Sequence, residues 1–284
     1  MTDKKSNSAI PDISFLERKA RQIRATLIQM AHDGKEGHLS SSLSYVDILV
    51  ALYYHWLRIF PDEPKNPERD RFLLSKGHGC TALYAVLADK GFFPVDWLNR
   101  YSQNDSPLPN HSCKHALPVL EMSAGSLGHG LGVATGKLYG LRLDKSDARA
   151  VVLMSDGECN EGSVWEAAMF ASAQKLENLL AIVDYNGIQA VGNSDEIMGH
   201  TSLEEKFRAF GWEAKTIDGS NIMEIINTLN EFPFKKGKPS AIIANTKIGV
   251  SFMEGDVLWH YRCPPEEELK LALEELNEIP IHKV

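Results

Sequence analysis

The sequence lacks several features that would have assigned it to a class at once. No two of its four cysteines are spaced as C-x-x-C, which excludes a zinc knuckle or a thioredoxin-type redox pair. No apolar run approaches the ~20 residues of a membrane span, and the polar first residues contain no apolar signal core. The net charge of −8 gives no support for nucleic-acid or anionic-membrane binding. These absences favour a cytoplasmic protein with reduced thiols.

What is present is the composition of an ordinary globular protein, with 43% hydrophobic and 24% charged residues. We expect residues 1–11 to be a disordered lead. From residue 12 to 284, apolar strand-like segments alternate with segments of helical periodicity. This alternation predicts a single α/β domain, a doubly wound parallel sheet with helices on both faces. Strands are expected at 71–74, 150–154, 179–184, 213–217 and 240–244. Helices are expected at 12–31, 45–57, 164–175, 203–210, 222–229 and 266–276, and one more between the glycine-rich turn after the first strand and about residue 90.

Two polar segments follow consecutive strands, SDGE at 155–158 and DYNG at 184–187. A right-handed βαβ crossover would place Asp156 and Asn186 at the same carboxyl edge of the sheet, where ligands bind in open α/β folds. A carboxylate and an amide oxygen suit Mg²⁺, which completes its shell with phosphate oxygens and water. Gly157 would allow close backbone approach. A lone strand-end aspartate is more often a helix cap, but the paired motifs favour a metal site.

The order Asp-Gly, about thirty residues, then Asn resembles the signature of thiamine-diphosphate enzymes. The resemblance implies that Asp156, Asn186 and the carbonyl of Ile188 hold magnesium against the diphosphate of the cofactor. It also implies that Gly157 and Glu158 lie beside the cofactor, with Glu158 behind the metal ligands. Serine precedes Asp156 where that family more often has glycine, and this change leaves the ligands untouched.

Other segments, all in the family's order, narrow the resemblance to transketolases over about residues 12–275. These are GH at 37–38 with SSS at 40–42, SKGHG at 75–79, LPNH at 108–111, GSLGHG at 125–130, and TKIG at 246–249 with WH at 259–260. The resemblance implies that His38, His111 and His260 are catalytic. Residues expected to contact the cofactor, besides those named above, are His38, His78, His260, Gly125, Ser126 and Leu127.

Three departures leave questions open. The segment Asn110-His111-Ser112 stands where the family usually has Gly-His-Pro, so that His115 competes for the substrate-facing role. Tyr261 follows His260 where glycine is common. Glu161 is either a plain helix-start carboxylate or a group that links cofactor sites.

The resemblance implies transfer of a two-carbon ketol unit from a ketose, or its phosphate, to an aldose, or its phosphate. In this class a glutamate from a pyrimidine-binding domain activates the cofactor. The chain ends at Val284, where the diphosphate-binding domain would finish. We therefore expect a separate transketolase C-terminal subunit to supply that domain and its glutamate, in an assembly with two copies of each chain.

Three alternatives remain. A nicotinamide dehydrogenase is suggested by GLGVATG at 130–136, although its third glycine is one position late and no clear strand precedes it. A non-catalytic scaffold subunit would have no need of the metal pair. A related ketol or acyl transferase of a specialised sugar pathway would fit the same motifs.

Overall fold

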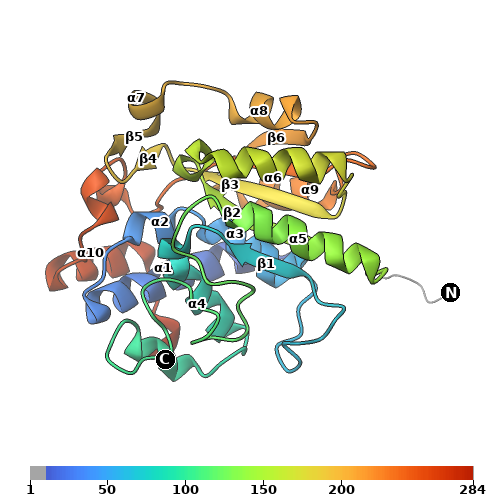
Figure 1. The fold of residues 1–284 in the computed structure, drawn as a ribbon. Coiled ribbons are helices and arrows are strands. Elements are labelled where there is room, and N and C mark those ends of the chain that lie inside the picture. Colours follow the sequence, from blue (N-terminus) through green and yellow to red (C-terminus); the bar gives the residue numbers. More distant parts are fainter. Residues whose placement is uncertain (1–10, 284) are drawn as a thin grey trace.

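A parallel sheet of five strands lies between two layers of helices (Figure 1). The computed structural model describes residues 11–283, so the expected disordered lead lies outside the described residues except for Pro11. The strand order is β1-β2-β3-β7-β6, and every neighbouring pair is parallel, which confirms the predicted fold class. The strands are β1 Arg71–Leu74, β2 Ala150–Ser155, β3 Leu179–Tyr185, β6 Glu213–Asp218 and β7 Ser240–Asn245, with a small hairpin of β4 Ile188–Gln189 and β5 Gly192–Asn193.

Both faces of the sheet are buried. Val151 and Leu153 of β2 belong to the core on one face of the sheet, whereas Val152 and Met154 belong to the core on the other face. Because alternate side chains enter opposite cores, the strands are nearly continuous apolar runs in the sequence. The helices are α1 Ile13–Gly34, α2 Leu39–Leu43, α3 Val46–Ala51, α4 Cys80–Asp89, α5 Gly130–Leu143, α6 Gly162–Ala173, α7 Ser194–Met198, α8 Leu203–Ala209, α9 Ile222–Asn230 and α10 Glu266–Leu276.

The helix expected at 45–57 is confirmed, and two helices were missed. The expected segment is helical over residues 46–56, as α3 followed directly by a π-helical turn, η1 (Leu52–Trp56). The short helix α2, which precedes it, was not predicted. The glycine-rich stretch at 130–140, for which no helix was predicted, is the first part of α5. Each glycine in a helix costs about 1 kcal/mol relative to alanine, but Leu131, Ala134 and Leu138 are buried on the sheet and offset that cost.

The chain order of the strands places a crevice at the carboxyl edge of the sheet. After β3 the chain crosses to the edge strand β6 and returns as β7, which lies between β6 and β3. Ser155 and Asp184 are partners in the β2–β3 register, and the Asp156 amide donates to the Asp184 carbonyl at 3.2 Å. The two polar motifs therefore meet at one edge, as predicted.

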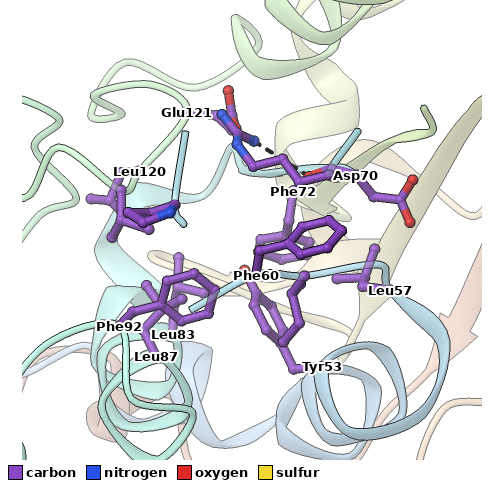
Figure 2. Close-up of a pocket in the computed structure, with 14 residues that line it drawn as sticks. Tyr53, Leu57, Phe60, Asp70, Phe72, Leu83, Leu87, Phe92, Leu120 and Glu121 are labelled. Atoms are coloured by element: carbon purple, nitrogen blue, oxygen red, sulfur yellow. Dashed lines mark hydrogen bonds and ion pairs between the residues drawn. The ribbon is translucent and has the colours of Figure 1, made fainter. Parts of the chain in front are cut away.

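A cavity away from this edge of the sheet lies beside the start of β1 (Figure 2). Tyr53, Phe60, Phe72 and Phe92 are among the side chains that line it, together with Asp70 and Glu121. None of the predicted site residues borders this cavity. Within residues 11–283, no helix is long and apolar enough to cross a membrane.

Candidate active site

One open cavity of about 1020 Å³, counting the space at its mouth, lies at the carboxyl edge of the sheet. It brings together ten of the predicted residues from segments far apart in the sequence. Figure 1 shows α2, β4 and β5, which flank it, close together on one side of the molecule. The predicted residues that line it are His38, His78, His111, Gly125, Leu127, Asp156, Gly157, Asn186, Ile188 and His260.

Four imidazoles converge in this cavity. The ring of His38 lies 5.3, 5.5 and 5.0 Å, centroid to centroid, from the rings of His78, His111 and His260, respectively. The His38 amide donates to the His260 carbonyl at 2.8 Å, which joins two distant loops. His38 has a left-handed backbone with φ of 60°, uncommon for a residue other than glycine. Its buried Nδ1 has no hydrogen-bond partner among the described residues, as expected of an atom that meets a ligand.

Burial favours the neutral form of His38, His78 and His260. Burial, with smaller effects of Lys76 and the other imidazoles, lowers the pKa of His78 to about 2. Burial, then His38 and Lys76, lowers the pKa of His260 to about 4. Burial, followed by nearby His111, also lowers the pKa of His38. Neutral imidazoles can both donate and accept a hydrogen bond at pH 7, which suits groups that move protons between oxygens.

The predicted metal ligands lie at the ends of β2 and β3. Asp156 is buried; its Oδ1 accepts from the Gly157 amide at 2.9 Å and its Oδ2 from the Ser194 hydroxyl at 2.5 Å. The Asn186 Oδ1 accepts from the Ile188 amide at 2.9 Å, and Gly187, with φ of 73°, turns the chain between these two residues. Burial raises the pKa of Asp156 to about 6, and a bound cation would favour the ionised form.

Glu158 and Ser126 were predicted to contact the cofactor, but neither lines the cavity. Glu158 is fully buried and accepts hydrogen bonds from the Ser75 hydroxyl and, at 2.7 Å, from the Gly128 amide. Burial raises the pKa of this carboxyl. Through these hydrogen bonds Glu158 supports the loop at 125–130, and its expected place behind the metal ligands stays a prediction. Ser126 is exposed on the same loop.

The structure shows where the residues lie whose roles the sequence left open. His115 is exposed and does not line the cavity, whereas His111 does. Glu161 lines the cavity directly before α6. Tyr261 is exposed near the mouth, with its ring 4.8 Å from that of His260. The GLGVATG segment lies inside α5, and the strand before it in the chain, β1, ends far upstream at Leu74, which contradicts a dinucleotide-binding turn.

Sequence reasoning missed several residues that line the cavity. Lys76 was quoted only as part of a motif, yet its fully buried side chain forms part of the wall. Lys76 forms a buried ion pair with Asp184, which lies far from it in the sequence. A linear pattern gives no sign of such a pair, because lysine is expected at the surface. The residues missed are Ser41, Lys76, Ser155, Asn160, Gln189 and Ala190.

The fold and the cavity together define a doubly wound α/β protein with an open, histidine-lined cavity at the carboxyl edge of its sheet. A family model described as "Transketolase, thiamine diphosphate binding domain" matches residues 16–260. The chain belongs to this family.

Among the relatives, a subunit of the apulose-4-phosphate transketolase of Actinobacillus succinogenes is 42% identical over 93% of this chain and 96% of its own. A 6-deoxy-6-sulfo-D-fructose transketolase subunit of a Clostridium species is 40% identical over 92% and 96%. Human transketolase is 36% identical over 93% of this chain but 42% of its own length. The transketolase structure from Campylobacter jejuni superposes with a TM-score of 0.88 at 30% identity, covering 95% of this chain and 44% of that one. This chain thus spans less than half of the single-chain transketolases.

Proposed function

We propose that this chain is the thiamine-diphosphate- and Mg²⁺-binding subunit of a two-chain transketolase, acting in the cytoplasm. In this proposal the enzyme transfers a two-carbon ketol unit from a ketose or ketose phosphate to an aldose or aldose phosphate. One observation carries the proposal: a single cavity holds Asp156 and Asn186 at one end and an array of four imidazoles beside them.

The residues present fit thiamine diphosphate with magnesium. The His38 Nδ1 lacks a partner among the described residues, and a Cβ at Gly125 would meet nothing within 4 Å, so this part of the wall is free to receive a ligand. Within residues 11–283, no group of three or more His, Cys, Asp or Glu side chains is placed to hold a metal. A site made of Asp156, Asn186 and the Ile188 carbonyl would supply only oxygen ligands, which suits a hard cation that takes its remaining ligands from diphosphate and water.

Bound thiamine diphosphate would supply the nucleophilic thiazolium carbon and the electron sink for the ketose carbonyl. The chain's own residues would orient and move protons. His38 and His111 would face the substrate oxygens, where a neutral imidazole can accept a hydroxyl proton and return it. His78 and His260 would contact the diphosphate end of the cofactor, with His260 also near the reacting atoms. Leu127 would pack against the thiazolium.

A partner chain completes the proposed enzyme. Three relatives, each covered over at least 95% of its length, are named as transketolase subunits, and the cavity is open to solvent. We expect a C-terminal transketolase subunit to cover the opening with its pyrimidine-binding domain and to supply the activating glutamate. Closed symmetry favours two copies of each chain.

A specialised ketose is the favoured substrate class. The relatives with the higher identities and nearly complete coverage are named for apulose 4-phosphate and for 6-deoxy-6-sulfo-D-fructose. Human transketolase is less similar and much longer. This difference favours a ketol transfer in a dedicated sugar pathway over the general one.

The metal assignment is tested by Asp156→Ala and Asn186→Ala in the complex with the partner chain. We expect isothermal titration to show thiamine diphosphate binding weakened by about 100-fold or more in the presence of Mg²⁺, because loss even of a residue supporting a metal ligand costs about 10- to 100-fold. Asp144→Ala, at the exposed end of α5, is the control. Unchanged affinity in a folded Asp156→Ala protein would show that the metal site lies elsewhere.

A further inference from the structure

Lys76 is a fully buried cation beneath the histidine cluster. Its side chain and that of Asp184 are both 0% exposed. The ammonium donates to the Asp184 Oδ2 and, at 2.6 Å, to the Ser41 carbonyl of α2. It also lies 4.4 Å from the centre of the Tyr45 ring. Each of these contacts is with a segment that borders the cavity or supports its wall.

Asp184 extends these contacts to two more segments. Its Oδ2 accepts from the Ser44 hydroxyl at 2.5 Å, and its Oδ1 accepts from the Thr246 hydroxyl at the end of β7. The ion pair therefore joins the loop of His78, the helix that follows His38, the end of β3 before Asn186, and the segment that leads toward His260. These four segments carry or lead to His38, His78, Asn186 and His260, which line the cavity together with residues of other loops.

An ion pair is an inefficient way to stabilise this part of the core. Desolvation of two buried charges offsets most of their attraction, so apolar residues of similar size would serve stability as well or better. The pair holds directional hydrogen bonds instead, and directional bonds fix the relative position of loops. The charge of Lys76 also helps to keep His78 and His260 neutral.

We propose that Lys76 is a positioning residue of this site, which sets the loop of His78 against α2 and the end of β3 so that the imidazoles face one cavity. This inference rests on the proposed function for its consequence in catalysis. Its structural part, the placement of the imidazole rings, concerns the isolated chain.

Three variants separate charge, hydrogen bonding and stability. Lys76→Gln retains an amide donor without the charge, and Lys76→Met loses both. The double variant Lys76→Met/Asp184→Asn leaves no unpaired carboxylate in the core, so that it folds even where Lys76→Met does not. Arg149→Gln is the matched control, because Arg149 pairs at 2.6 Å with the buried Asp70 at the opposite edge of the sheet (Figure 2 shows Asp70).

The first measurement is the ¹⁵N NMR spectrum of the histidine rings in the full chain without cofactor. We expect the signals of His38, His78 and His260 to move or broaden in Lys76→Met and in the double variant, to move less in Lys76→Gln, and to keep their wild-type positions in Arg149→Gln. Wild-type ring signals in the folded double variant would overturn the proposal.

The second measurement is turnover of the complex with its partner. We expect kcat to fall about 10- to 100-fold in the double variant while the KM for the sugar changes little, because misplaced groups lose transition-state contacts first. Wild-type kcat in the double variant would also overturn the proposal. Since the ring signals need no cofactor, failure of the wild-type complex to bind thiamine diphosphate would contradict the proposed function alone.

Discussion

At the scale of single residues, His38 is the centre of the candidate site. Its ring neighbours three other imidazoles, its backbone is left-handed, and its buried Nδ1 has no partner among the described residues. A left-handed conformation costs an L-residue about 1 kcal/mol or more, and an unpaired buried nitrogen adds to that cost. A folded chain tolerates this combination where a ligand supplies the missing contact.

The placement of His111 gives a prediction for the substrate-facing role. We expect His111→Ala, like His38→Ala, to lower kcat by about 100-fold or more with a small effect on cofactor affinity, because general acid–base groups contribute about 10²- to 10⁴-fold. His115→Ala should leave the steady-state kinetics of the complex unchanged, since His115 is exposed outside the cavity. Normal kinetics for His111→Ala together with a large loss of kcat for His115→Ala would assign the substrate-facing role to His115.

The lowered pKa values predict how stability depends on pH. With the pKa of His78 near 2 and that of His260 near 4 in the folded chain, the unfolded chain binds more protons between about pH 4 and 6.5. The free energy of unfolding should therefore be highest above pH 6.5 and fall as the pH is lowered through this window. The raised pKa of Asp156 has the opposite effect on the pH dependence of the free energy of unfolding. The effect of His78 is therefore measured by comparing the wild type with a variant that lacks this histidine.

We expect urea unfolding at pH 7 and pH 5 to show a larger loss of stability for the wild type than for His78→Gln. The exposed His115→Gln should behave as the wild type. Equal losses for all three proteins would mean that His78 is not held neutral by its surroundings.

The site could be predicted from the sequence where single motifs carry the chemistry. Asp156, Asn186 and the histidines follow strand ends or lie in loops with recognisable neighbours, and the structure brings them to one cavity. Lys76 and Gln189 were missed because their role depends on burial and on contacts between segments, which a linear motif does not encode. Their cavity contacts appear only once β1, β3 and the β4–β5 hairpin are placed together.

At the scale of secondary structure, elements with a strong apolar period were predicted and those with a weak one were not. The five strands and the amphipathic α9 and α10 lie within a residue or two of their expected bounds. The helix α5 was missed because glycine disguises its period, and the short α2 was missed because all of its residues are buried and show no amphipathic pattern. The hairpin β4–β5 and α7 are too short to leave a pattern.

Two glycines of α5 provide a test of this account. A Cβ at Gly136 would meet nothing within 4 Å, whereas a Cβ at Gly130 would lie 2.2 Å from the Ser75 Oγ. We expect Gly136→Ala to raise the free energy of unfolding of the isolated chain by about 0.5–1 kcal/mol. Gly130→Ala should lower it, because the backbone must move. Thermal or urea unfolding that showed a loss of stability for Gly136→Ala would contradict the described packing of this helix.

At the scale of the whole molecule, the residues proposed to hold the diphosphate end of the cofactor lie together at one edge of the sheet. The cavity at that edge is open to solvent, whereas ligand sites usually enclose most of their ligand. Three relatives, each covered over at least 95% of its length, are named as subunits, whereas human transketolase and the Campylobacter jejuni transketolase are more than twice as long as this chain. These facts support the proposal that a second chain covers the cofactor.

The most direct test of the central claim is ketol transfer by the purified chain, with and without its partner, in the presence of thiamine diphosphate, Mg²⁺ and candidate sugar phosphates. We predict no turnover for the chain alone, because the glutamate that activates the cofactor is expected on the partner, and turnover once the C-terminal subunit is added. Robust turnover by the chain alone, with no partner detectable by mass spectrometry, would contradict the account.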